Sequence, residues 1–485
     1  MRKIIAIAVV VTFCLGSGFS QGLPDAVRYS FFNYTGSARS VGAGGTLGAL
    51  GADFAVMSTN PAGLAMYRKS DIIFTPGFLI REVDSRLTTD PNSPVVSRDQ
   101  NTLALDNLGI VFASVKPETS RWRTFNIAIG LNQLANFKRE FIFSGNSTGS
   151  IVDRFQELAN LQGFSSQEAA LAINADAVYD LEEDGIYESD VELAPNARIN
   201  KEQLVTETGT LSELVLSFAG NYEERLLFGA TIGLPIVNFE QEKIYQEEDE
   251  NGTVPFFDNL RYDQNLTTTG VGINFKLGMI YRAHQMLRLG FAVHSPTGYS
   301  LEDSFSSRLV YNFTDDGQAF TGQAQAPGGS FSYDLNSPWR FMGSVGVLFG
   351  KIGFLSADVE YVDYGGARLI FDGFEEDEEI VNADINQNLS NALNIRVGGE
   401  LAVDMFRFRA GFGLLPAPVD DQSEDIYNYS VGAGLRQESF YVDIAFRRTE
   451  AAESYVPYLT NLSQDQIVEN EINTNRILLT LGFRF

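Results

Sequence analysis

Apolar and polar residues alternate in short segments along most of the chain. One segment has its apolar positions at Val271, Ile273, Phe275, Leu277 and Met279. Similar alternation recurs near 355–361, 393–401, 406–414 and 440–447. A period of two residues is typical of a β-strand with one apolar and one polar face. The pattern therefore predicts an all-β protein.

Fourteen antiparallel strands are predicted in total, and their connections differ between the two ends. The predicted ranges are 70–83, 105–116, 122–143, 210–222, 225–243, 265–282, 286–312, 331–350, 351–371, 393–403, 405–415, 427–436, 439–449 and 475–485. Connections after even-numbered strands are short, whereas those after odd-numbered strands are long, which is typical of an outer-membrane β-barrel. The longest loop, 144–209, is acidic and contains helical patterns near 151–161 and 166–179.

A soluble all-β sandwich or propeller would also show alternation. The absence of a 40-residue sequence repeat argues against a propeller. The last strand favours a membrane barrel, because its apolar face ends on Phe485, which resembles the signal that the outer-membrane assembly machinery recognises. Trp122 and Trp339 fall at predicted strand ends, where an interfacial aromatic belt would place them.

Residues 1–20 are interpreted as a secretory signal peptide. Arg2 and Lys3 precede an apolar stretch from Ile4 to Leu15, and 18–20 form a small-x-small cleavage site. The only cysteine, Cys14, lies within this segment. No later run of 18 apolar residues occurs, so a membrane location would require a closed barrel, here in a Gram-negative outer membrane.

Gly36–Tyr67 is glycine-rich and apolar but follows neither a strand nor a helix period. Its apolar side chains need cover, so we expect this stretch to lie inside a barrel formed by the rest of the chain. A phosphate-binding loop is the alternative. Its G-x-G-x-x-G spacing fails, because Leu47 stands where the third glycine would be.

Composition excludes several classes of function. The net charge of −27 argues against nucleic acid as a partner. Of the two histidines, His294 is adjacent to Ser295, so their side chains would point to opposite faces of a strand, which argues against an enzyme. No metal site or cofactor is expected, and the acidic run Glu375–Glu379 is interpreted as a solvated loop.

The sequence GSARSVGAGGTLGALGADFAVMSTNPAGLAMY at 36–67 resembles the start of the FadL-type outer-membrane transporters, the OMPP1/FadL/TodX family, in the variant seen in Bacteroidetes. The segments HSPTGYSLED (294–303) and SADVEYVDYGGARL (356–369) are also similar to that branch. The resemblance implies a 14-stranded barrel, here residues 69–485, plugged by an N-terminal hatch, here residues 21–68. It also implies passage of hydrophobic compounds, such as long-chain fatty acids or aromatic hydrocarbons, with a lateral exit at a kinked third strand.

Candidate site residues follow from that expectation. Ligand-binding candidates in the hatch are Phe54, Val56, Met57, Leu64 and Met66. For any one of them, packing of the hatch against the wall is the favoured interpretation, and lining of a pocket by several together is the alternative. Asn60, Pro61 and Ala62 match the family's NPA motif and are expected to shape the hatch. The strand-three kink is expected among Gly130, Asn132, Gln133 and Asn136.

Charged residues on the inward face of the strands are expected to pair, because unpaired buried charge is costly. Arg407 or Arg409 is the alternative candidate to bind a fatty-acid carboxylate. The expected function is passive uptake of hydrophobic small molecules, with outer-membrane lipids and lipopolysaccharide as surroundings. A structural or surface-interaction barrel with a closed lumen, and a porin for polar solutes, are the alternatives.

Overall fold

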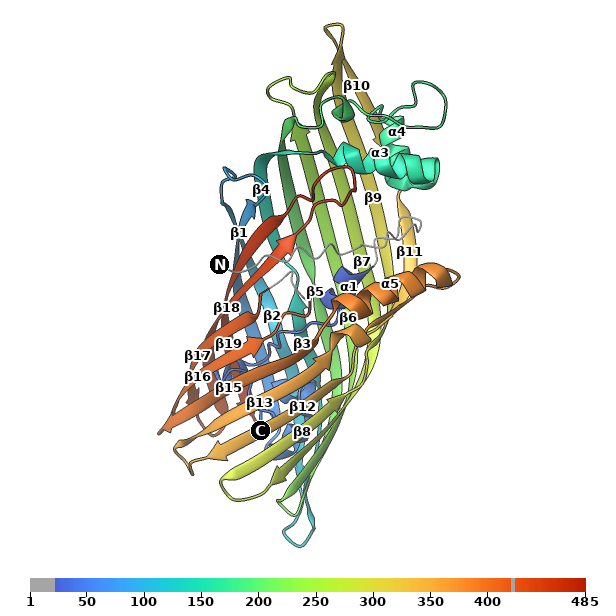
Figure 1. The fold of residues 1–485 in the computed structure, drawn as a ribbon. Helices are drawn as coiled ribbons and strands as arrows, with labels where there is room; N and C mark the ends of the chain where they lie inside the picture. Colours follow the sequence, from blue (N-terminus) through green and yellow to red (C-terminus); the bar gives the residue numbers. More distant parts are fainter. Residues whose placement is uncertain (1–21, 420–423) are drawn as a thin grey trace, which may run out of the picture.

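The computed structural model describes residues 22–419 and 424–485, which form one closed β-barrel (Figure 1). The predicted signal peptide lies outside the described residues. The first strand, β1 (Asp71–Leu87), pairs antiparallel with both β2 (Val96–Val115) and the last strand, β19 (Val468–Arg484). This pairing closes the ring, so the backbone groups of the wall bond to neighbouring strands rather than face lipid.

The predicted 14-strand antiparallel barrel is confirmed, although several strands are interrupted. The interrupted strands are β3 (Trp122–Asn136) with β4 (Arg139–Thr148), β8 (Leu287–His294) with β9 (Gly298–Asp315), β11 (Gly329–Asn336) with β12 (Arg340–Leu348), and β13 (Gly353–Asp363) with β14 (Arg368–Ile370). The others are β5 (Arg198–Tyr222), β6 (Leu226–Glu248), β7 (Phe257–Arg282), β15 (Asn391–Val403), β16 (Phe406–Leu415), β17 (Ile426–Arg436) and β18 (Phe440–Tyr455). A further segment, β10 (Gln318–Gln325), pairs with the far end of β9.

The long connections lie at one end of the barrel and the tight turns at the other; we call these the long-loop end and the short-turn end (Figure 1). Several strands extend further toward the long-loop end than predicted. The strand β5 begins at Arg198 rather than at 210, so the longest loop is 149–197. Lys201 and Gln203 are buried on the inner face of this extension. Polar residues at buried positions hid the alternation from the sequence pattern.

The helices predicted in that loop are present as α3 (Ile151–Gln162) and α4 (Gln167–Asn174), with short 3₁₀ turns at Gly163–Ser165 and Val191–Leu193. The interpretation of Glu375–Glu379 as a loop was wrong, because this run begins α5 (Glu375–Asn388). Acidic side chains in a first turn favour a helix by offsetting the positive end of its dipole. Ile385 of α5 is fully buried, which anchors the helix.

The outer surface of the wall is an apolar belt. On β7, Phe275 is 52% and Leu277 is 63% exposed, whereas the intervening Asn274 and Lys276 face the lumen and are buried. A closed barrel with an apolar exterior and a polar interior is suited to cross a bilayer. Within the described residues, no helix is both long enough and apolar enough to cross a membrane.

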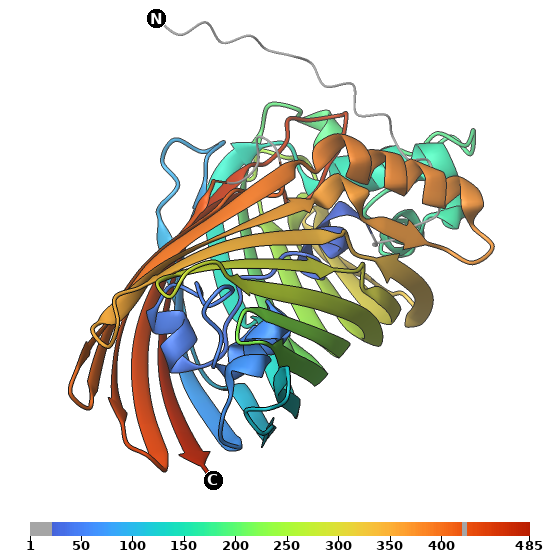
Figure 2. The same cartoon turned by 90° about the horizontal axis from the view of Figure 1, so that it is seen from below.

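The N-terminal segment lies inside the barrel, as predicted (Figure 2). It contains α1 (Leu23–Arg28), α2 (Ala38–Gly42) and two 3₁₀ helices, η1 (Phe54–Ser58) and η2 (Pro61–Met66). Its glycines permit close packing: Gly51 has a φ of +65°, and a Cβ there would lie 2.6 Å from the Cα of Gly63. We call residues 22–68 the hatch.

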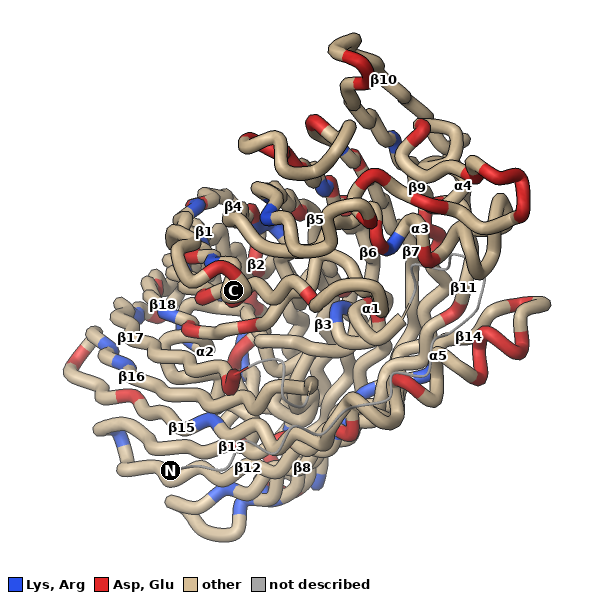
Figure 3. The backbone as a smooth tube through the Cα atoms, turned by 45° about the horizontal axis from the view of Figure 1, so that its top comes forward, with Lys and Arg blue, Asp and Glu red and all other residues tan. Residues whose placement is uncertain are grey.

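Acidic residues are concentrated at the long-loop end and along α5 (Figure 3). The loop 149–197 contributes Asp180, Glu182, Glu183 and Asp184 in one exposed turn. Basic residues are more evenly spread along the chain (Figure 3). Some, such as Lys276 and Arg409, are buried in ion pairs with other wall residues. The two ends of the barrel therefore differ in charge as well as in loop length.

Candidate functional site

A cavity of about 540 Å³ lies at the long-loop end, between α3, α4, α5 and the inner faces of β5, β6, β7 and β9. We call it the long-loop cavity. Its apolar lining residues are Ile151, Leu158, Leu161, Leu266, Phe305, Ile380, Val381, Val456, Pro457 and Leu459. The rest of the lining consists of tyrosines and of polar or charged side chains such as Gln203, Gln241 and Gln264. The cavity is therefore amphipathic, and its apolar patches are suited to contact the apolar part of a small molecule.

A few charged side chains also line the long-loop cavity. Arg154 of α3 donates from Nε to the Glu168 carboxylate of α4 at 2.6 Å. Burial disfavours the charge on Arg154, but the Glu168 carboxylate outweighs this effect and raises the pKa of the guanidinium. Lys243 lies with its Nζ 5.7 Å from the centre of the Tyr455 ring. The lining of the long-loop cavity therefore mixes charged, polar and apolar side chains.

A buried aromatic cluster separates the long-loop cavity from the lumen below. Ala26, Tyr29 and Phe32 of the hatch pack in this cluster with wall residues such as Tyr299 and with Ile385 of α5. The segment is further fixed by Arg28, which is paired with Asp25 and lies 4.0 Å from the centre of the Phe239 ring.

Below the cluster is a small cavity of about 20 Å³, which we call the lumen pocket. Such a volume has room for about one water molecule. The pocket is lined by Phe32, Tyr34, Leu134, Glu213, Asn274, Lys276, His294, Ser295, Thr297, Ser337 and Arg340. The Lys276 ammonium pairs with Glu213, and Arg340 pairs with Glu360 at 3.1 Å. Charge pairing therefore surrounds the pocket on its wall side.

The five hatch side chains predicted to bind ligand do not line either cavity. Phe54, Met57 and Leu64 are fully buried in one cluster with the wall strands. Val56 is buried in a separate cluster, and Met66 accepts a contact at Sδ from Arg282 at 2.9 Å. These positions agree with the packing interpretation, and a role in ligand binding stays a prediction.

Phe54 also explains two glycines of the wall. A Cβ on Gly109 of β2 would lie 1.9 Å from Cζ of Phe54, and one on Gly130 of β3 would lie 2.3 Å from the same atom. The two glycines are paired in a regular part of the ladder. Gly130, one of the predicted kink residues, is thus a place where the ring rests directly on the backbone.

The NPA turn is built into the hatch. Asn60 caps η2 by accepting from the amide of Ala62, and its Nδ2 donates to the carbonyl of Gly48 at 2.7 Å. Pro61 stands at the first position of η2, where a missing N–H costs nothing. His294, rather than pairing with a serine, contacts the carbonyl of Thr59 through Nε2 at 2.6 Å. These contacts hold the turn against the wall.

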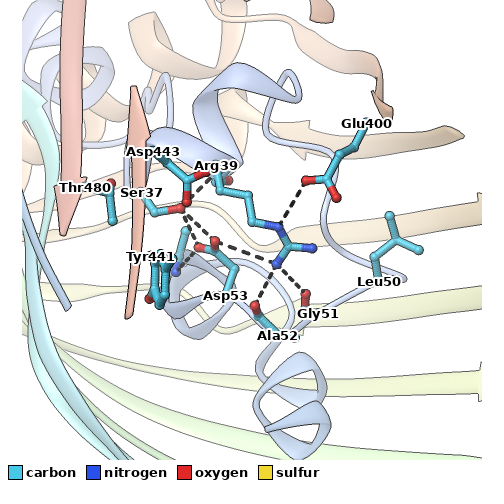
Figure 4. Close-up of polar contacts among 12 residues, drawn as sticks. Ser37, Arg39, Leu50, Gly51, Ala52, Asp53, Glu400, Tyr441, Asp443 and Thr480 are labelled. Atoms are coloured by element: carbon cyan, nitrogen blue, oxygen red, sulfur yellow. Dashed lines mark hydrogen bonds and ion pairs between the residues drawn. The ribbon is translucent and has the colours of Figure 1, made fainter. Parts of the chain in front are cut away.

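Arg407 and Arg409 face the lumen but already have protein carboxylates as partners. Arg409 donates to Glu400 at 2.7 Å and to Asp443 at 2.6 Å, while Arg407 lies 3.8 Å from Glu400. Arg39 of α2 also approaches Glu400, at 3.7 Å, and Figure 4 shows it between that carboxylate and Asp53. The ion-pairing interpretation therefore describes these arginines, and a ligand carboxylate there stays a prediction.

The third strand is irregular close to the predicted positions. Its register with β5 shifts between Gln133 and Ala135, and the strand is interrupted at 137–138. Its ladder with β2 ends at the pair Asn107 and Asn132. Beyond that point, within the described ladders, β4 pairs only with β5. A seam between β2 and β4 is left, bridged by side chains such as Gln100 and Glu140 at 3.1 Å.

Two residues that the sequence did not single out hold this irregular strand. Arg81 of β1 donates to the carbonyls of Lys138 and Asn136, at 2.8 and 3.2 Å. Thr35 of the hatch donates to the carbonyl of Gln133 at 2.6 Å. These side chains donate hydrogen bonds to backbone carbonyls that would bond to a neighbouring strand in a regular ladder. The sequence offers no signal for either role, because both depend on where a distant strand breaks.

No family model matches the sequence, and no curated protein matches it. Solved structures do share its architecture. A FadL homologue from Pseudomonas aeruginosa matches with a TM-score of 0.55 at 15% identity, covering 94% of this chain and 100% of that one. The toluene transporter TodX from Pseudomonas putida matches with a TM-score of 0.52 at 11% identity, covering 94% and 100%. The chain has the fold of the FadL-type channels.

At these identities the likeness establishes the FadL-type fold and not the residues that would bind a ligand. The expectation of a 14-stranded barrel with an inserted hatch, drawn from Gly36–Tyr67, is confirmed. The long-loop cavity was not predicted. Its lining comes from segments as distant as Ile151 and Leu459, so no local motif could reveal it.

Proposed function

We propose that this FadL-fold barrel is an outer-membrane channel that takes up hydrophobic small molecules by passive diffusion. The observation that carries the proposal is the long-loop cavity, whose lining includes ten apolar residues although the surrounding loops are acidic. Transfer of an apolar molecule from water to such apolar side chains is favourable by about 25 cal/mol for each Å² of apolar surface buried. The toluene transporter with the same fold supports the same class of substrate.

The orientation follows from the role. The long-loop end faces the outside, where the cavity meets incoming solutes, and the short-turn end faces the periplasm. Residues 22–68 act as the plug, and 1–20 act as the secretion signal. The apolar belt contacts outer-membrane lipids, with lipopolysaccharide around the outer rim. Phe485 at the end of β19 is the contact for the assembly machinery.

The route leads from the long-loop cavity, past Tyr29 and Phe32, into the lumen pocket. It then leaves sideways at the seam between β2 and β4, because the hatch fills the lumen further down. Leu134, at the register shift of the third strand, lines the lumen pocket and so places the pocket beside that seam. Leu103 of β2 is 83% exposed on the outer side of the seam, which gives the route an apolar exit.

The filled lower lumen argues against a porin for polar solutes. Hatch, wall and ion pairs such as Arg39 with Glu400 occupy the cross-section there. The filled lower lumen is also compatible with the second interpretation, a surface-interaction barrel whose lumen never opens. The two differ in one respect: only a channel moves hydrophobic molecules across the membrane. No catalytic step or cofactor is part of the proposal.

Uptake by whole cells tests it. Cells that lack other hydrocarbon channels, with and without this protein, are given radiolabelled oleate and, separately, radiolabelled toluene. We expect faster accumulation of at least one of them when the protein is present. A labelled sugar serves as the control and should enter at the same rate in both strains. Transport would be rejected if oleate and toluene each accumulated at the same rate with and without the protein, provided that the protein is shown to be folded in the outer membrane.

A further inference from the structure

The wall has a second interruption, on the side formed by β8–β9 and β11–β12. The ladder between these strands stops at the pair His294 and Arg340 and resumes at Gly298 and Asn336. The intervening residues are Ser295, Pro296 and Thr297 on one strand and Ser337, Pro338 and Trp339 on the other. A proline thus stands in the middle of each interruption, at the same level of the wall.

Few hydrogen bonds join the two strands at this level. The amide of Ser337 donates to the carbonyl of Thr297 at 3.0 Å, and the amide of Thr297 donates to Oγ of Ser337 at 2.9 Å. Proline has no N–H, so neither Pro296 nor Pro338 can add a ladder bond. On the next strand pair, 363–367 bulge opposite 337–339, so pairing with β13 and β14 is also broken. The wall is weakened across three neighbouring strands.

The lumen pocket lies directly behind this interruption. Ser295, Thr297 and Ser337 are part of its lining, and Phe32 and Tyr34 of the hatch face them across the pocket. The same pocket contacts Leu134 at the irregular third strand. One cavity therefore reaches two separate weak places in the wall.

The lipid side of the interruption is apolar. Phe275 on β7, Phe291 on β8 and Trp339 are 52%, 49% and 53% exposed, and the Trp339 ring stacks with Phe341. Further along β9 the outward residues become polar, beginning with Ser300. The interruption lies at the edge of the apolar belt, where an interfacial tryptophan is expected.

We propose that the interruption at 295–297 and 337–339 is a second lateral portal, through which a small apolar molecule passes between the lumen pocket and the lipid. This inference rests on the proposed transport function. Opening requires the two bonds between Thr297 and Ser337 to part and Phe32 and Tyr34 to move off the pocket. A purely structural role, in which the prolines bend the wall where it leaves the membrane, is the alternative that the experiment decides.

A removable cross-link tests the portal. In a Cys14→Ser background the chain has no native cysteine, so Thr297→Cys with Ser337→Cys can form only one disulfide. Uptake of radiolabelled toluene is compared in oxidised and reduced cells. We expect oxidation to lower the rate on the order of twofold, since one of two gated routes is closed, and reduction to restore it. The control pair is Glu302→Cys with Ser332→Cys, which are cross-strand partners beyond the interruption, and its disulfide should leave uptake unchanged.

Equal uptake before and after reduction, with complete disulfide formation shown by thiol labelling, would overturn the portal. Uptake no faster than in cells without the protein, even when reduced, would instead reject transport itself and the portal with it. A second variant, Pro296→Ala with Pro338→Ala, adds two N–H donors without a cross-link. It should slow uptake in the same direction, and unchanged uptake in this variant would count against the portal.

Discussion

The short-turn half of the lumen is filled with protein, whereas the long-loop half holds a cavity of about 540 Å³. The inward faces of the strands are polar in both halves. In the lower half these polar groups form ion pairs with one another and with the hatch. Glu400, for example, pairs with Arg409 of the wall and with Arg39 of the hatch. In the upper half, helices α3 and α5 bring apolar side chains inward over the rim. The proposed function thus assigns capture to the long-loop end and closure to the short-turn end.

Removal of residues 36–67 should have the largest effect, because it empties the lower half. We expect a barrel that conducts small ions and sugars, since the wall pairs around the ring without the hatch. Single-channel recording in planar bilayers would show large steady conductance for the deletion and little for the full chain. A deletion that stays non-conducting while folded would show that the lower half is closed by something other than the hatch.

Glu400→Gln should be the next most severe change. It removes the charge of the carboxylate that Arg39 and Arg409 share, while Asp53 and Asp443 remain as their partners. Loss of a hydrogen bond to a charged group costs about 1.5–3 kcal/mol. Urea unfolding in detergent, followed by tryptophan fluorescence, measures the loss. The control Glu469→Gln, at an exposed position of β19, should change stability by less than about 0.5 kcal/mol. Equal stability of the two variants would show that the ion pairs of Glu400 do not help to hold the hatch in the lumen.

Gly109→Ala examines how tightly the hatch is seated. The new Cβ would overlap the Phe54 ring, and overpacking costs about 1–3 kcal/mol. In a Phe54→Ala background the same change should cost little, because the ring it met is gone. The four proteins form a double-mutant cycle in urea. Additive free energies would mean that the ring does not rest on the β2 backbone.

Leu266→Glu should have the smallest effect and concerns the upper half alone. It places a carboxylate in the apolar lining of the long-loop cavity, so we expect slower uptake of oleate with unchanged stability. Leu181→Glu is the matched control, since Leu181 is 74% exposed outside the cavity. Similar uptake by both variants would leave the cavity without a role in capture.

Local patterns were sufficient for the barrel but not for its contents. Alternation at Val271–Met279 and tight turns such as Glu223-Glu224 are encoded by neighbouring residues, so strands and their order were predictable. The inner extension of β5 was missed because Lys201 is buried at a position where the pattern expects an apolar residue. Arg81 satisfies carbonyls of a strand more than fifty residues away, which no local signal records.

The contacts of the hatch were likewise not predictable from its local sequence. Its glycines and the Asn60-Pro61 turn predicted close packing. They did not predict which side chains would contact the wall and which would line a cavity. Phe54 and Met57 were candidates for ligand contact on hydrophobicity alone, and they lie in the hatch–wall cluster. The apolar patches of the long-loop cavity come instead from α3, α5, the segment 456–459 and the inner faces of β7 and β9.

Photochemical labelling tests the central claim most directly. Purified barrel in detergent is irradiated with a fatty acid that carries a diazirine near its methyl end, and labelled peptides are found by mass spectrometry. The account predicts labelling within 151–168 and around Leu266 and Phe305, reduced by excess oleate. Labelling confined to the lipid-facing belt, or unaffected by competitor, would contradict capture in the long-loop cavity.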